Sequence, residues 1–211
     1  MKTELQAYWY QTVAALCLLV LVGTLQAEDV PESERLGPYD VVVKAANELQ
    51  RNLDGKHDYY TENSAELYEL IDSVLLPSFD VQQVGKLVLG KQHWLAASED
   101  QRQRFITAFY GFLVKTYAKG ILGFEQNEMQ VKPDPAFSKD KRKALVGTEL
   151  ALANGDAVEV NYALREVDAI WKIYDVRIDG VSYVQNYRNQ FDAEISVRGL
   201  EAVIERLESG A

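Results

Sequence analysis

Cysteine and histidine are scarce in this sequence of 211 residues, which contains one cysteine and two histidines. Cys17 lies in an apolar stretch near the N-terminus, so the rest of the chain has no disulfide and no thiol nucleophile. His57 and His93 have no other metal-ligating residue at a useful spacing, and a lone histidine is a weak indication of a catalytic or metal site. The motifs of zinc peptidases, serine hydrolases, P-loop enzymes and dinucleotide-binding enzymes are also absent. These absences leave little support for catalysis.

Positive charge is also limited, with 22 lysines and arginines against 32 aspartates and glutamates, which gives a net charge of −10. Nucleic-acid binding requires a concentrated positive surface and is therefore disfavoured. An acidic protein is also repelled by anionic lipid surfaces. If the protein works at membranes, we expect it to dock there on protein partners.

The longest apolar run, VAALCLLVLV, starts at Val13. Its ten residues are fewer than the ~20 that span a bilayer, but they suit the core of a signal peptide. Lys2 precedes this run, and the small residue Ala27 follows it. The pattern predicts a secretory signal peptide over residues 1–27, with an uncleaved anchor as the alternative, and a polar lead-in over 28–38.

Residues 39–211 are predicted to fold as a single α+β domain around one hydrophobic core. Apolar residues recur at the helical period in the first and last parts and at the two-residue period of strands in the middle. Helices are predicted over 39–53, 64–76, 81–89, 99–119, 183–195 and 198–208. Strands are predicted over 125–132, 143–152, 157–166 and 169–179. Asn154-Gly155 is a strong signal for a type I′ hairpin turn, so the sheet is expected to be antiparallel.

The segment 99–119 has the clearest helical signal. Ser98 and Gln101 fit a capping box before it, and Gly120 follows it. Its apolar residues cover most of the circumference rather than a single stripe. This pattern predicts burial on two flanks, by neighbouring elements or by a ligand. Asp80 is likewise a candidate N-cap for the preceding helix.

The segment WKIYDVRIDGVSYVQNYRNQF, residues 171–191, joins an irregular strand to a helix rich in tyrosine. Trp171 and Ile173 point to one side of the strand, whereas Tyr174 and Val176 point to the other. This predicts coverage of both faces or a bulge between them. Together with the long helix, the segment supplies more apolar surface than a two-layer domain requires. That surplus predicts a pocket for apolar ligands, although each residue alone is typical of ordinary core.

Three segments carry a family resemblance: LYELIDSVLLPSFDVQQVGKLVLGKQHW (67–94), SEDQRQRFITAFYGFLVKTYAKGI (98–121) and WKIYDVRIDGVSYVQNYRNQF (171–191). They are similar to the MlaC family of periplasmic phospholipid shuttles of Gram-negative bacteria, also described as toluene-tolerance proteins. The matched elements are LLPSFD, a Gly and a Trp, the QRxxF helix and WxxYDxxxxGVS. The similarity covers nearly all of residues 39–207.

This resemblance implies N-terminal helices, a curved four-stranded antiparallel sheet and C-terminal helices, which together enclose a deep apolar cavity for phospholipid tails. It implies a carrier without enzyme activity or cofactor, because phospholipid is the cargo. The implied partners are an outer-membrane lipoprotein complex of the MlaA type and an inner-membrane ABC transporter with MCE domains. The implied role is to move phospholipid between the two membranes through the periplasm, which maintains outer-membrane lipid asymmetry. Nothing in the sequence suggests an obligate dimer, and we expect a monomer.

The cavity wall is expected to come from the inner faces of the predicted elements. The expected lipid-binding residues are Val74, Leu75, Phe79, Val84, Val88, Trp94, Phe105, Phe109, Phe112, Leu113, Tyr117, Val158, Val160, Tyr162, Trp171, Ile173, Tyr174, Val176, Val181, Val184 and Tyr187. Lys86, Lys91, Lys115 and Lys119 are candidates for a basic patch near the mouth, although isolated surface lysines are the more ordinary reading.

Two other hypotheses remain open from the residues alone. The first is a small α+β enzyme that uses a pocket carboxylate, Asp175 or Asp179, although these residues are spaced as neighbours on a solvated strand. The second is a structural periplasmic adaptor whose interior is filled by its own side chains. A cavity in the structure distinguishes the carrier from the adaptor.

Overall fold

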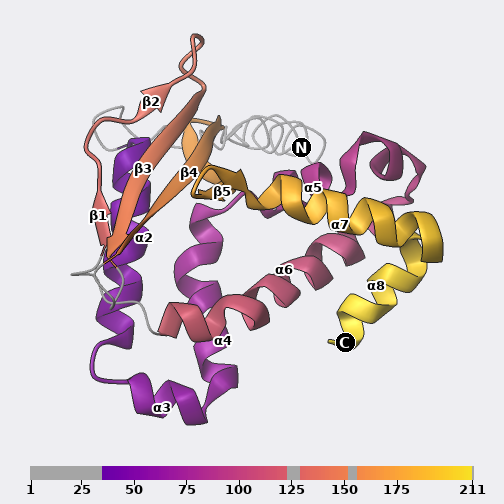
Figure 1. The fold of residues 1–211 in the computed structure, drawn as a ribbon, viewed down its shortest axis with the longest axis horizontal. Coiled ribbons are helices and arrows are strands. Elements are labelled where there is room, and N and C mark those ends of the chain that lie inside the picture. Colours follow the sequence, from indigo (N-terminus) through magenta and orange to yellow (C-terminus); the bar gives the residue numbers. More distant parts are fainter. Residues whose placement is uncertain (1–34, 123–128, 152–155, 211) are drawn as a thin grey trace, which may run out of the picture. The chain divides into compact units, whose positions relative to one another are not determined.

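A computed structural model describes residues 35–122, 129–151 and 156–210 (Figure 1). The helices are α2 (Pro38–Leu53), α3 (His57–Glu62), α4 (Ser64–Leu75), the 3₁₀ helix η2 (Leu76–Ser78), α5 (Val81–Ala96), α6 (Glu99–Leu122), α7 (Tyr183–Arg198) and α8 (Leu200–Ser209). The strands are β1 (Met129–Val131), β2 (Ala136–Phe137), β3 (Lys143–Ala151), β4 (Ala157–Val167), β5 (Ile170–Ile178) and β6 (Val181–Ser182). The order of helices, strands and helices confirms the predicted α+β class.

The strands form one antiparallel sheet in the order β1-β3-β4-β5-β6, with β2 also paired to β3. The four predicted strands correspond to β1, β3, β4 and β5. The described residues contain two further strands, β2 and β6, that were not predicted. Each has two residues and is too brief to show a period. The predicted turn at Asn154-Gly155 lies outside the described residues. Ala151 pairs with Ala157 on either side of it, so β3 and β4 are adjacent antiparallel strands.

A β-bulge in β5 resolves the irregular pattern of that strand. Leu164 pairs with Ile173 and Ala163 pairs with Asp175, which leaves Tyr174 as the extra residue. Because the bulge shifts the alternation by one position, the residues after Tyr174 exchange faces. Ile173 and Val176 therefore lie on the same face of the sheet, which is the face covered by helices. Of the two predicted explanations, the bulge is confirmed.

The predicted start of α5 is confirmed and its predicted end is wrong. The Asp80 carboxylate accepts a hydrogen bond from the Gln83 backbone N–H at 3.0 Å, as an N-cap does. Gly90 breaks the helical conformation with a φ of 68°, but helical geometry resumes and continues to Ala96. A positive φ at one glycine kinks the chain without stopping it, and His93 beyond the kink still contacts Asp192 of α7. The six-residue α3 was not predicted, because a helix this short has no periodic apolar stripe.

The long helix α6 is the central element of the fold. Its capping box is confirmed by two reciprocal bonds of 3.1 Å, from the Gln101 N–H to Ser98 Oγ and from the Ser98 N–H to Gln101 Oε1. One group of its side chains packs on α5, α7 and α8, and another packs on α2, α3 and α4. Burial on two flanks is thus confirmed, and it explains why apolar residues surround most of this helix.

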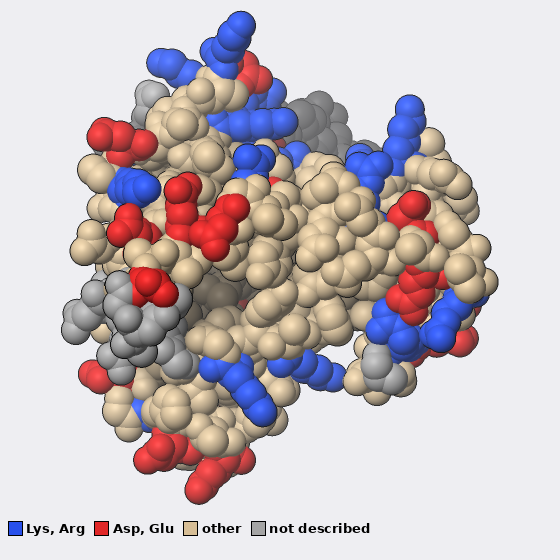
Figure 2. Space-filling view, viewed as in Figure 1, with Lys and Arg blue, Asp and Glu red and all other residues tan. Residues whose placement is uncertain are grey.

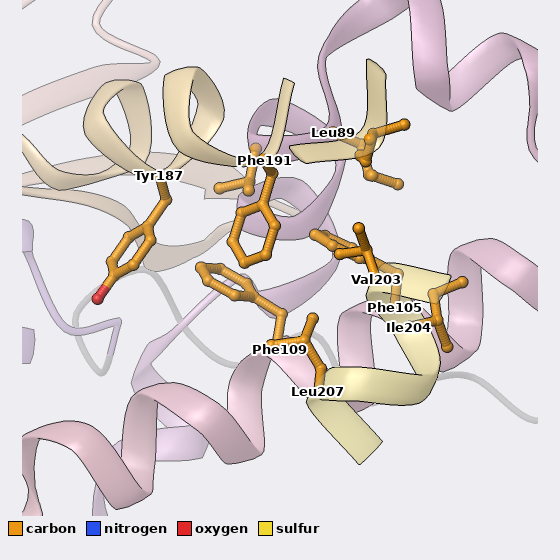
Figure 3. Packing of buried hydrophobic residues seen from close by; sticks show 10 residues of the cluster. Leu89, Phe105, Phe109, Tyr187, Phe191, Val203, Ile204 and Leu207 are labelled. Atoms are coloured by element: carbon orange, nitrogen blue, oxygen red, sulfur yellow. The ribbon is translucent and has the colours of Figure 1, made fainter. Parts of the chain in front are cut away.

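The interior between α5, α6, α7 and α8 is filled by aromatic and aliphatic side chains (Figure 3). Phe105 is fully buried, and its ring meets that of Phe191 edge to face at 5.4 Å. Phe109 makes the same type of contact with Phe191, also at 5.4 Å, and with Tyr187 at 5.3 Å. Edge-to-face packing is favourable for aromatic rings and leaves little free space. This half of the molecule is therefore a solid core.

Gly85 allows α5 and α6 to approach closely, and we predict that Gly85→Ala destabilises the protein by about 1–3 kcal/mol. A Cβ at this position would lie 2.5 Å from Cγ1 of the buried Ile106. The free energy of unfolding in urea measures the effect. Gly111→Ala in α6 is the matched control, because a Cβ there meets nothing within 4 Å. The control should gain about 0.5–1 kcal/mol from helix propensity, and equal stability of the two variants would contradict the prediction.

Candidate functional site

A cavity of about 420 Å³ lies between the inner face of the sheet and helices α2, α4, α6 and α7. Its volume is within the range of roughly 300–1,000 Å³ that is typical of small-ligand sites. In Figure 2 a hollow is visible between the sheet and α6. Gly120, in the last turn of α6, lines the cavity and is exposed to solvent, so an opening lies beside it.

The wall is almost entirely apolar, and α2 shows how the sequence produces the free space. Val42, Ala45, Ala46 and Leu49 recur at helical spacing and face the cavity. Two of these four are alanines, whose side chains are too short to reach the opposite wall. The apolar face of α2 is therefore buried without filling the space in front of it.

More than half of the residues that the sequence analysis selected line this cavity. They are Leu75, Phe79, Val84, Phe109, Leu113, Tyr117, Tyr162, Ile173, Tyr174, Val176, Val184 and Tyr187. They come from α4, α5, α6, β4, β5, α7 and, for Phe79, the bridge residue after η2, and these segments are separated in sequence and brought together by the fold. Whether they contact a lipid remains a prediction.

The other selected residues lie away from the cavity lining. They are Val74, Val88, Trp94, Phe105, Phe112, Val158, Val160, Trp171 and Val181. Val88 and Phe105 belong to the filled core, and Trp94 and Phe112 pack against it. Val74 is buried among the helices α2, α3, α4 and α6. Val181 lies in the short strand β6 and is 57% exposed.

Sequence reasoning missed a further part of the wall. The missed lining residues are Val42, Ala45, Ala46, Leu49, Ile71, Val81, Ile106, Tyr110, Val114, Gly120, Ile121, Met129, Ile178 and Tyr183. Asp175 also lines the cavity, and it had been named only as the pocket carboxylate of the enzyme hypothesis. The apolar stripe of α2 was visible in the sequence, but nothing in it distinguishes a stripe that faces a cavity from one that faces a core. Gly120 has no side chain, so no apolar pattern could indicate that it lines the cavity.

Hydroxyl groups supply most of the polarity on the wall. The Tyr110 hydroxyl donates to Asp72 Oδ1 at 2.8 Å, and the hydroxyls of Tyr117 and Tyr187 lie 2.8 Å apart. Burial, together with these hydrogen bonds, raises the pKa of Tyr110 and of Tyr117 well above the ordinary value. These groups stay protonated and neutral at physiological pH, so the wall carries little charge.

Asp175 is the acidic residue on the wall, and its carboxylate is engaged by the fold. It is 7% exposed, and its Oδ1 accepts hydrogen bonds from the Ser182 hydroxyl at 3.0 Å and from the Val184 N–H at 3.2 Å. Its Oδ2 lies 3.4 Å from Arg177 Nε. The carboxylate thus joins β5 to the first turn of α7, where negative charge is favourable. Asp179 is exposed in the turn between β5 and β6.

The histidines and lysines are distributed over several elements. His93 Nε2 lies 2.8 Å from Asp192 Oδ1, which links α5 to α7, whereas His57 lies in α3. Within residues 35–122, 129–151 and 156–210, no group of three or more potential ligands is placed to hold a metal ion. None of the helices in these ranges is long and apolar enough to cross a membrane.

Of the four lysines proposed for a basic patch, Lys86 lies over the Trp94 ring at 5.7 Å, and Trp94 is not part of the cavity wall. Lys91 is exposed on α5. Lys115 and Lys119 are exposed on α6, and Lys119 directly precedes the lining residue Gly120. Basic side chains project over α6 beside the hollow in Figure 2. Of the four lysines, Lys119 is the one next to the exposed lining residue Gly120, and it therefore fits a position at the mouth of the cavity.

The chain is similar to several known proteins. The family model described as MlaC protein matches residues 43–209. The toluene tolerance protein ttg2D of Pseudomonas putida is 29% identical over 154 residues, which cover 73% of this chain and 71% of that protein. The intermembrane phospholipid transport system binding protein MlaC of Haemophilus influenzae is 21% identical over 177 residues, which cover 82% of each chain.

A solved structure has the same fold. It is the phospholipid-binding protein of Ralstonia solanacearum in complex with a phospholipid, with a TM-score of 0.71 and 24% sequence identity. The superposition covers 81% of this chain and 94% of that one. At this level of identity the likeness establishes the arrangement of helices and sheet.

Proposed function

Because the chain belongs to the MlaC family, we propose that it is a periplasmic phospholipid carrier that holds acyl chains in the cavity between the sheet and helices α2, α4, α6 and α7. The observation that carries the proposal is the cavity itself. It is apolar and open beside Gly120, and the charged side chain in its wall, that of Asp175, is hydrogen-bonded within the fold. A carrier of this kind needs no catalytic group. The names of the P. putida and H. influenzae relatives support the same assignment.

The free energy of transferring acyl chains from a bilayer explains how a cavity without groups that bind the headgroup can still take up lipid. Each buried methylene contributes ~0.8 kcal/mol, so two chains of ~16 carbons bring roughly 20 kcal/mol or more in gross transfer free energy. A bilayer offers nearly the same free energy to the same chains. The net difference between carrier and membrane is therefore small, and lipid can load and unload without a chemical step.

The direction of transfer must then be set by partners. We propose that the protein exchanges phospholipid with an outer-membrane lipoprotein complex of the MlaA type and with an inner-membrane ABC transporter that carries MCE domains. Export by the predicted signal peptide, residues 1–27, would place it in the periplasm between them. Its role there would be to maintain outer-membrane lipid asymmetry.

Organic extraction of the purified protein tests the proposal. We expect mass spectrometry to detect phospholipid at close to a stoichiometric amount, because a cavity lined this way is favourable for alkyl chains and unfavourable for water. Protein that is purified gently from a Gram-negative host and contains no phospholipid would contradict the carrier assignment. The filled-core adaptor hypothesis predicts that empty result.

A further inference from the structure

Tyr162 projects from the centre of the sheet into the cavity. It lies on β4, opposite Val146 of β3 and opposite Val176 of β5, on the face covered by helices. Val146 is fully buried in the core between α2 and the sheet, and the Tyr162 ring packs against that core. The same side chain also lines the cavity. Its ring is therefore held by the core while its hydroxyl end reaches the wall of the cavity.

The hydroxyl of Tyr162 differs from those of the tyrosines bonded to neighbours. Tyr110 bonds to Asp72, and Tyr117 bonds to Tyr187. No group in the part of the chain that the structure describes forms a hydrogen bond with the Tyr162 hydroxyl. Burial alone raises the pKa of this hydroxyl, with no contribution from a charge or a hydrogen bond. No polar side-chain atom is sealed in the described interior without a partner, so the Tyr162 hydroxyl is open to the cavity.

An unpaired buried hydroxyl constrains what the cavity should hold. A ligand made only of hydrocarbon at this point would remove water from the hydroxyl and offer nothing in exchange, which is unfavourable. A ligand that brings a hydrogen-bond acceptor to the same point avoids this loss. In a phospholipid, the acceptors nearest to the chains are the ester carbonyls, which enter an apolar cavity together with the first methylenes.

We propose that the Tyr162 hydroxyl donates a hydrogen bond to an ester carbonyl of the bound lipid, and that the site thereby selects ester-linked over ether-linked phospholipids. This inference rests on the proposed function and adds a lipid class to it. An ether-linked lipid with the same headgroup and chain length fills the same volume but has no carbonyl. A net hydrogen bond of ordinary strength gives a preference of about fivefold.

A competition between two lipids tests the inference. The purified protein is incubated with vesicles that contain equal amounts of diacyl phosphatidylcholine and of dialkyl-ether phosphatidylcholine with matched chains. The protein is then separated from the vesicles, and both lipids are quantified by mass spectrometry. We expect the wild-type protein to hold the ester lipid in about fivefold excess. Tyr162→Phe should hold both lipids in nearly the vesicle ratio.

Tyr68→Phe is the matched control, because Tyr68 is half-buried among the helices and does not line the cavity. It should keep the wild-type preference. An equal ratio in the wild-type protein would overturn the inference, since a trapped water molecule would then satisfy the hydroxyl. A preference that persists in Tyr162→Phe would also overturn it, because a group other than this hydroxyl would then recognise the carbonyl. Uptake of neither lipid by the wild-type protein would overturn the proposed function itself. If the variant does not fold, an equal ratio in the wild-type protein still overturns the inference.

Discussion

Gly120→Trp is expected to lower the phospholipid bound per folded protein by about tenfold or more, which corresponds to ~1.4 kcal/mol of binding free energy. Gly120 lines the cavity, is exposed at its opening, and has nothing within 4 Å of an added Cβ. An indole ring at this position enters space that the lipid requires. The helix itself should tolerate the change, because glycine is a poor helix former. Extraction followed by mass spectrometry measures the lipid, and circular dichroism measures the fold.

Gly111→Trp provides the matched control for this variant. Gly111 is in the same helix and also has nothing within 4 Å of an added Cβ, but it does not line the cavity. The control should keep the wild-type amount of lipid. If Gly120→Trp is folded and as loaded as the control, the lipid does not occupy this cavity, and the proposed binding site is wrong.

Phe105→Ala is expected to lower the free energy of unfolding by about 3–5 kcal/mol. The Phe105 ring has no exposed surface, and it packs against Phe109 at 5.7 Å as well as against Phe191. Truncation leaves a void among α5, α6, α7 and α8 that the surrounding helices cannot fully close. Urea unfolding followed by circular dichroism measures the loss.

The same variant separates stability from lipid binding. Phe105 does not line the cavity, so the lipid bound per folded protein should stay within about twofold of the wild-type value. Phe112→Ala should cost less than Phe105→Ala, because Phe112 is half-buried. A loss below about 1 kcal/mol for Phe105→Ala would show that this region is loosely packed, in disagreement with the structure.

The elements of the fold were largely predictable because their signals are local. The capping box at Ser98 and the N-cap at Asp80 each depend on residues within one turn, and both form as expected. Period-two alternation located the long strands for the same reason. Gly90 was misread because a glycine with positive φ can either end or kink a helix. Packing beyond that residue decides between the two.

The cavity wall was only partly predictable because apolar character does not reveal what it faces. Phe105 and Leu113 lie on the same helix and are equally suited to burial, yet one fills the core and the other lines the cavity. The bulge at Tyr174 also sets which residues of β5 share a face, and its position depends on pairing with β4. Asp175 looked like a candidate acid, and the structure uses it to bind the start of α7.

The amino-acid sequence alone determined the class of fold, most helix and strand positions and the family resemblance, since these depend on residues close together in the chain or on matching segments. The tertiary structure alone decided which apolar surfaces meet and which leave a cavity. That outcome depends on contacts between α2, α6, α7 and the sheet, and on the small side chains of Ala45, Ala46 and Gly120 that leave space unfilled. Whether two surfaces pack closely depends on the side chains of both, whereas the apolar pattern of one segment describes only one of the two surfaces.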